Sequence, residues 1–109
     1  MKAADILRKA RGFIARGWTQ GEYARDAEGV PVNSRHPSAV CWCASAALHA
    51  TDNYGEERLA AYRGLCAAIG TNGFQLFEWN DTPGRTQAEV LAAFDQAIAA
   101  LEGRPGGAT

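Results

Sequence analysis

The sequence of 109 residues has no long apolar run, no excess of charge of one sign and only three cysteines. Without about 20 consecutive apolar residues it holds no candidate membrane-spanning helix, and charges interrupt its N-terminal apolar positions too often for a signal peptide. With 11 basic and 12 acidic residues, the formal net charge of −1 gives no general attraction to nucleic acid or to an anionic membrane. We therefore expect a cytoplasmic protein that binds neither.

The three cysteines, Cys41, Cys43 and Cys66, are odd in number and form no regular framework, which argues against a secreted disulfide scaffold. Cys-x-Cys, one distant cysteine and two scattered histidines match no common zinc-site spacing. The sequence also has no glycine-rich phosphate loop and no serine in a nucleophile elbow. We expect neither a bound metal nor another cofactor.

Apolar residues at helical spacing predict four main helices in a single domain. Their expected ranges are 2–16, about 37–50, about 55–69 and 86 to about 101. Glycines suited to a helix end follow three of them, at Gly17, Gly70 and Gly103. The predicted fold class is all-α: a compact bundle of four main helices with two long ordered loops and scope for a minor two-stranded element.

The inward faces of the last three predicted helices consist mainly of apolar residues, and those of the helix at about 37–50 are small, so a neighbouring helix can approach it closely. The residues expected to be buried are Val40, Cys43, Ala44, Ala47, Leu48, Leu59, Tyr62, Leu65, Cys66, Ile69, Val90, Leu91, Phe94, Ala97, Ile98 and Leu101. Residues 1–103 are expected to form the helical domain. Residues 104–109 are expected to form a flexible tail.

Two connections separate the helices, and ordered connections of this length often carry function. In the first, residues 17–36, Tyr23-Ala24-Arg25-Asp26 is compatible with a short strand or a helical turn, and Val30-Pro31-Val32 with an extended piece. In the second, residues 71–85, the apolar residues between Phe74 and Phe77 nearly alternate. They predict a short strand or a 3₁₀ piece.

The stretch from Trp79 to Val90 combines a turn with the start of the last helix. Asn80-Asp81 and Pro83-Gly84 are turn-forming pairs. Thr86 and Glu89 have the spacing of a capping box, in which the hydroxyl and the carboxylate each accept a backbone N–H of the other residue. We therefore expect the segment before Thr86 to be a braced loop.

The strongest binding candidates lie in residues 18–26, the first loop, and residues 79–85, the second loop. Tryptophan, tyrosine and arginine dominate binding hot spots when they are exposed together. The candidates are Trp18, Gln20, Tyr23, Arg25, Asp26, Trp79, Asn80, Asp81 and Arg85. In the alternative interpretation the tryptophans cover helix ends, Arg25 pairs with Asp81, and Arg85 pairs with Asp26. If the first and last helices are antiparallel neighbours, the two loops lie side by side in either case.

A second alternative is a cysteine-dependent enzyme for acyl transfer or hydrolysis. A cysteine near a helix N-terminus can have a lowered pKa and act as a nucleophile with a histidine base. Cys41 and Cys43 are predicted to have that placement, but the spacing of His36 and His49 guarantees no contact with either thiol. In the structural interpretation Cys43 is a small core residue and Cys41 is partly exposed.

Three segments resemble a small bacterial and phage family of unknown function. They are Gly17-Trp18-Thr19-Gln20-Gly21-x-Tyr23-Ala24-Arg25-Asp26, Trp42-Cys43-Ala44-x-x-Ala47-Leu48, and Trp79-Asn80-Asp81-x-Pro83-x-Arg85-Thr86-x-x-Glu89-Val90. The chain differs from that family in having Ser45-Ala46 where a glycine is often found. The resemblance implies that both loops matter and that the protein is associated with phages or mobile elements. It implies no catalytic residue.

The function predicted from the sequence is therefore a small cytoplasmic protein-binding module. It would engage a protein partner through the first and second loops. No oligomeric state is predicted.

Overall fold

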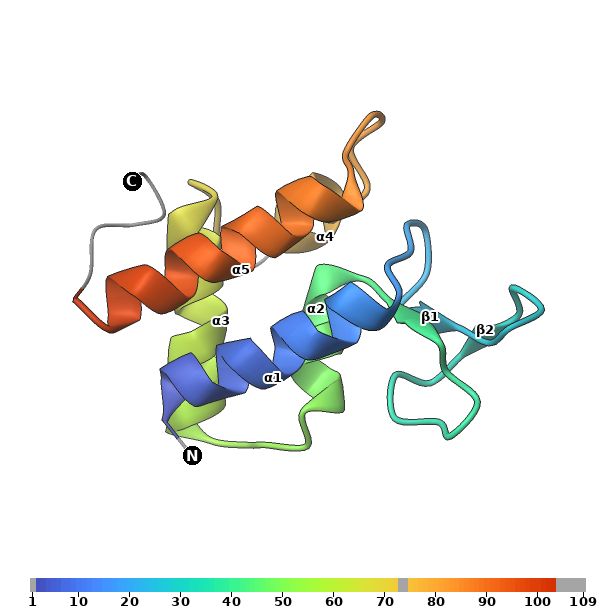
Figure 1. The fold of residues 1–109 in the computed structure, drawn as a ribbon, viewed down its shortest axis with the longest axis horizontal. Coiled ribbons are helices and arrows are strands. Elements are labelled where there is room, and N and C mark those ends of the chain that lie inside the picture. Colours follow the sequence, from blue (N-terminus) through green and yellow to red (C-terminus); the bar gives the residue numbers. More distant parts are fainter. Residues whose placement is uncertain (1, 73–74, 104–109) are drawn as a thin grey trace.

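The computed structural model describes residues 2–72 and 75–103, and the fold is mainly helical with one small sheet (Figure 1). The helices are α1 (Ala3–Arg16), α2 (Ala44–Ala50), α3 (Glu56–Ala68), α4 (Leu76–Asn80) and α5 (Gln87–Leu101). The strands are β1 (Ala24–Arg25), β2 (Pro31–Val32) and β3 (Cys41–Trp42). The predicted helical majority is confirmed, but the described residues contain a fifth helix and a third strand that the sequence did not predict.

Helices α1 and α5 lie side by side and run in opposite directions, and α3 crosses behind both (Figure 1). The buried residues of α1 recur at helical spacing and form one face: Ala3, Ile6, Leu7, Ala10 and Ile14. They pack in the same core as Val90 and Phe94 of α5. Gln87 Nε2 donates to the Ile14 carbonyl at 2.7 Å, so the end of α1 lies beside the beginning of α5.

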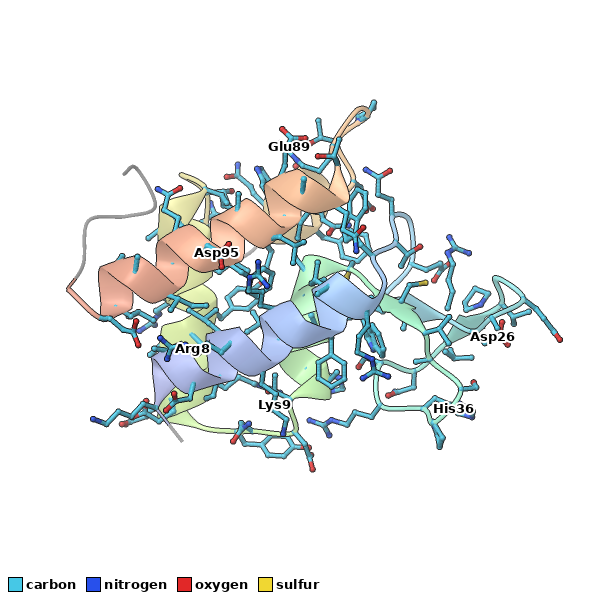
Figure 2. All side chains as sticks on the ribbon, viewed as in Figure 1. Arg8, Lys9, Asp26, His36, Glu89 and Asp95 are labelled. Atoms are coloured by element: carbon cyan, nitrogen blue, oxygen red, sulfur yellow. The ribbon has the colours of Figure 1, made fainter. Side chains whose placement is uncertain are left out.

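Ion pairs between arginines of α1 and acidic residues lie along the exposed side of this helix pair (Figure 2). Arg11 pairs with Asp95 of α5 at 2.6 Å, and Arg8 pairs with Glu102. Exposed pairs of this kind contribute about 0–1 kcal/mol each. The apolar face of α1 is therefore the main source of stability in this contact, because a fully buried leucine or isoleucine contributes about 1.5–3 kcal/mol.

The small sheet lies at one end of the helices and has the order β2-β1-β3, with both pairs antiparallel. The central residue Ala24 faces Val32 on one side and Trp42 on the other. Gly17 ends α1 with an extended backbone, and a side-chain carbon there would lie 2.1 Å from the Val40 carbonyl oxygen. Gly17 is thus required for the close approach of α1 to the sheet.

Helix α2 begins later than predicted because residues 40–43 pair with the sheet. The N–H groups of Val40 and Cys43 donate to carbonyls of β1 and of the residue before it, both at 2.9 Å. The helix therefore starts at Ala44, and Val40, which was predicted to be buried, is 45% exposed. Strand pairing is favoured over an earlier helix start because the Val-Cys-Trp run fits an extended, half-buried strand better than the first turn of a helix.

Two other expectations about local structure change, and a third is not tested. The segment predicted to be a strand or 3₁₀ piece contains the α-helix α4, and Phe74 lies outside the described residues. Leu59 and Leu101 were predicted to face inward, but they are 46% and 43% exposed. The predicted tail at 104–109 also lies outside the described residues and stays a prediction.

The predicted ends of α3 and α5 are confirmed. Thr86 is the N-cap of α5, and both hydrogen bonds of its capping box with Glu89 are present. Gly70 and Gly103 follow α3 and α5 with φ of +72° each, a conformation that favours glycine. Within the described ranges, no helix combines the length and hydrophobicity needed to cross a membrane.

Candidate functional site

Asn80, the last residue of α4, is fully buried and joins several segments of the chain. Its Oδ1 accepts hydrogen bonds from Trp18 Nε1 at 2.8 Å and from the Ala44 backbone N–H at 3.0 Å. Its Nδ2 donates to the Thr19 carbonyl at 3.1 Å and to Asp81 Oδ1 at 3.0 Å. Breaking any of these bonds would leave polar groups unsatisfied in or near the core, so Asn80 fixes the segments that it joins.

The first and second loops lie side by side, as predicted from the antiparallel first and last helices. Gln20 Nε2 donates to the carbonyls of Asn80 at 3.0 Å and of Thr82 at 3.1 Å. The N–H of Gly21 donates to Asp81 Oδ1 at 3.0 Å. These bonds connect residues about 60 positions apart, so the two loops form one structural unit.

The predicted ion pair between Arg25 and Asp81 is wrong. Arg25 instead donates to Thr19 Oγ1 at 3.0 Å, to the Gln20 carbonyl at 3.2 Å and to the Gly29 carbonyl at 3.1 Å. These acceptors lie within six residues of Arg25, so little chain entropy is lost in reaching them. The hydrogen bonds of the guanidinium thus stabilise the conformation of the first loop.

The predicted pair between Asp26 and Arg85 is also wrong. Asp26 accepts two backbone N–H groups of the β1–β2 turn, both at 2.9 Å. Arg85 Nε donates to the Trp79 carbonyl at 3.0 Å, and its guanidinium carbon lies 4.2 Å from the centre of the Trp79 ring. Arg85 also pairs with Glu89 at 3.6 Å. Both residues therefore stabilise their own loops.

Tyr23 is the predicted binding residue that reaches an open cleft. Its side chain is 58% exposed, and its ring contacts Phe77 of α4 edge-on with the ring centres 5.3 Å apart. Trp18 and Trp79, in contrast, are half-buried and pack against the core. The loops thus place one aromatic side chain at the cleft, and most of their polar groups are used between themselves.

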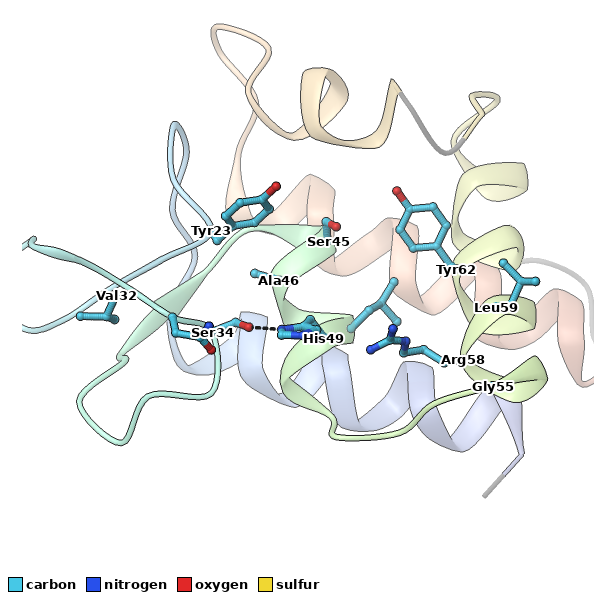
Figure 3. Close-up of a pocket in the computed structure, with 12 residues that line it drawn as sticks. Tyr23, Val32, Ser34, Ser45, Ala46, His49, Gly55, Arg58, Leu59 and Tyr62 are labelled. Carbon is cyan, nitrogen blue, oxygen red and sulfur yellow. Dashed lines mark hydrogen bonds between the residues drawn. The ribbon is translucent and has the colours of Figure 1, made fainter.

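The cleft has a volume of about 510 Å³ and opens between the sheet, α2 and α3 (Figure 3). Tyr23 and Val32 line it from the sheet side, Ser45 and His49 from α2, and Leu59 and Tyr62 from α3. This volume lies in the range of small-ligand pockets, about 300–1,000 Å³, and the mixture of apolar walls with a few polar groups is typical of them.

Ser34 and His49 form a hydrogen-bonded pair at one side of the cleft (Figure 3). The Ser34 hydroxyl contacts His49 Nδ1, and the Ser34 carbonyl accepts the indole N–H of Trp42 at 2.8 Å. Burial lowers the pKa of His49, and the charges of Arg35 and Arg58 lower it further. His49 is therefore a neutral hydrogen-bonding group at neutral pH.

Arg58 projects from α3 into the cleft, toward His49 (Figure 3). Its guanidinium carbon lies 5.1 Å from the centre of the Tyr54 ring, a cation–π contact. Its Nη1 is buried and donates to no acceptor among the described residues. A buried N–H without an acceptor costs about 1–3 kcal/mol, and more when it is charged. Arg58 thus provides an unused donor at the cleft.

Among the described residues, neither Cys41 nor Cys43 forms a hydrogen bond with a histidine ring. Cys43 is fully buried, its sulfur accepts the N–H of Ala46 at 3.4 Å, and burial raises its pKa. Cys41 is half-buried, and its Sγ donates to the Arg25 carbonyl at 3.8 Å. Both histidine rings hydrogen-bond to serines. A thiol without a histidine base lacks the activation that this kind of nucleophilic catalysis needs.

Residues 2–72 and 75–103 contain no cluster of three or more His, Cys, Asp or Glu side chains that could hold a metal ion. A protein-family model, described as a family of unknown function (DUF6197), matches residues 1–100. The chain belongs to DUF6197. The match spans the sheet, both loops and the cleft of this DUF6197 member. No curated protein and no solved structure matches the chain.

Sequence reasoning did not assign Ser34, His49, Arg58 and Tyr62 to a site. The signal that could have found three of them is spacing. Ser45 and His49 are four residues apart on α2, and Arg58 and Tyr62 are four apart on α3, so each pair lies on one face of its helix. Tyr62 was instead assigned to the buried face, because its ring fits the apolar period.

Proposed function

We propose that this DUF6197 member is a protein-binding module whose recognition surface is the cleft between the sheet, α2 and α3. The observation that supports this proposal is a gathering of exposed apolar side chains. Tyr23 and Leu59, 58% and 46% exposed, line the cleft, and Tyr54, 62% exposed, contacts Arg58 beside it. Exposed apolar side chains around a concave surface are typical of binding sites, and tyrosine is enriched among their hot spots.

In this proposal the two loops support the surface from behind. The hydrogen bonds of Asn80 hold the first loop against α4, and Phe77 of α4 packs against the Tyr23 ring. A side chain held in this way loses less conformational freedom when a partner binds. The loops therefore contribute to binding mainly through Tyr23.

The alternative of a cysteine-dependent acyl-transfer or hydrolytic enzyme has less support. Cys43 is buried with a raised pKa, and Cys41 donates to a backbone carbonyl. Neither thiol has a histidine partner among the hydrogen bonds of the described residues. The cytoplasmic location and the association with phages or mobile elements rest on composition and resemblance, and they stay predictions.

A library of random peptides displayed on beads tests the proposed surface. We expect the purified protein to enrich a family of related peptides, because a cleft of this size holds one or two anchor side chains. Leu59→Arg places a charge on the cleft wall and should abolish the enrichment. Val30→Arg is the matched control, because Val30 is 50% exposed in the β1–β2 turn and does not line the cleft.

Three outcomes would contradict the proposal. Enrichment that survives Leu59→Arg would place the binding surface elsewhere on the protein. The absence of any enriched peptide, with both variants folded, would mean that the cleft does not recognise peptide segments. Loss of enrichment in Val30→Arg alone would assign recognition to the sheet end.

A further inference from the structure

Among the described residues, the lining of the cleft carries positive charge and no negative charge. Among the described residues that line it, Arg58 alone carries a permanent charge, and no aspartate or glutamate is present. The other polar lining groups are neutral hydroxyl and amide groups and the ring of His49. A cationic group facing a carboxylate-free concave surface favours an anionic occupant.

Arg58 also differs from four other arginines of the described residues, because it has no carboxylate partner. Arg8, Arg11, Arg35 and Arg85 each have a carboxylate within 4.0 Å. Arg58 contacts the ring of Tyr54 instead, and no acidic residue in the described ranges forms an ion pair with it. The ring orients the guanidinium without neutralising its charge, so an anionic group in the cleft would face a guanidinium that has no acidic partner among the described residues.

The surroundings of Arg58 indicate what else the occupant carries. Val32, Leu48 and Leu59 provide apolar walls in the same cleft, and the Tyr23 ring borders it. Apolar walls around one cation suit an anionic group attached to an apolar body. A phosphate, with a charge of about −1.5 to −2, usually requires several arginines, whereas a single guanidinium matches a carboxylate in charge and shape.

From this geometry we infer that the cleft recognises a partner segment in which an aspartate or glutamate lies next to an apolar side chain, and that Arg58 binds the carboxylate. The inference rests on the proposed function and specifies the chemistry of the partner. The apolar side chain packs between the sheet side and Leu59. The neutral His49 and the nearby hydroxyl groups line the cleft as further polar groups and add no charge.

The test uses a synthetic peptide library that is acetylated at the N-terminus and amidated at the C-terminus, so that side chains supply all carboxylates. It is screened against the wild-type protein, Arg58→Gln, Arg63→Gln and Leu59→Arg. Arg63→Gln is the matched control because it removes the same charge from an exposed position of α3 that does not line the cleft. We expect the wild-type protein and the control to select Asp or Glu at one position, beside an apolar residue. Arg58→Gln should lose the acidic preference.

The affinity of the protein for a selected peptide is then measured by calorimetry. Arg58→Gln should weaken its binding roughly tenfold or more, the loss expected for one charged hydrogen-bonded contact. Replacing the acidic residue of the peptide by its amide should weaken binding to the wild-type protein by a similar factor. Because the two changes remove the same contact, combining them should add little further loss. The peptide change tests the contact even if Arg58→Gln folds poorly.

The outcomes separate this inference from the proposed function. Selection of purely apolar peptides that depends on Leu59 would overturn the carboxylate and leave the proposed binding surface in place. Acidic selection that persists in Arg58→Gln, or losses that simply add in the double change, would overturn the assignment to Arg58. No selection by the wild-type protein above Leu59→Arg would overturn both.

Discussion

Replacing Asn80 with alanine is expected to lower the free energy of unfolding by about 3–5 kcal/mol. The change removes the partners of the Trp18 indole N–H, the Ala44 N–H and the Thr19 carbonyl. An unsatisfied buried polar group costs about 1–3 kcal/mol. The Ala44 group is buried and should cost most, whereas Trp18 and Thr19 are half-buried, so water can compensate part of their loss.

This loss is a large share of the stability of a small domain, which is typically about 5–15 kcal/mol. Urea denaturation followed by circular dichroism measures it, with an unchanged slope confirming that the folded state keeps its compactness. Gln20→Ala is the control, since its bonds join the same loops at a less buried position, and it should cost about 1 kcal/mol.

Asn80→Asp provides a second variant of nearly the same shape. It keeps an acceptor for Trp18 and Ala44, but it loses the donor to Thr19 and places a carboxylate beside Asp81. Burial and this like charge should raise the pKa of the new carboxyl, so the variant should regain stability as pH falls and the carboxyl is protonated. A loss in Asn80→Ala no larger than in Gln20→Ala would refute the reasoning that Asn80 joins the two loops.

Three further predictions concern caps and titrating groups. Thr86→Ala removes the N-cap hydroxyl of α5 and should cost about 1 kcal/mol in a urea melt, and unchanged stability would show that the cap is dispensable. Because the unfolded chain protonates His49 more readily, near its ordinary pKa of 6.5, stability should be full above that pH and fall below it. His49→Gln should flatten this slope between about pH 7 and pH 5, and equal slopes would contradict the lowered pKa. Because burial raises the pKa of Cys43, a thiol reagent at neutral pH should label Cys43 more slowly than Cys41, and fast labelling of Cys43 would favour the enzyme alternative.

Local signals in the sequence are sufficient to predict the three long helices and where they begin or end. The apolar period of α1, the capping box of Thr86 and Glu89, and the glycines after α3 and α5 all act over a few neighbouring residues. Such signals depend on one turn of backbone geometry, so they can be identified without knowing the rest of the fold. The neighbouring positions of the two loops followed from pairing the first and last helices in opposite directions.

Contacts between groups of the loops and helices, in contrast, depend on the packing of the whole chain. Residues 40–43 joined the sheet because strand partners from β1 and from the end of α1 were available there, and no local pattern specifies those partners. Arg25 and Arg85 had several acceptors in reach, and the folded loops selected the nearby ones. The cleft arises where α2, α3 and the sheet leave space between side chains far apart in sequence. Its unpaired Arg58 therefore became visible only once these elements were placed together.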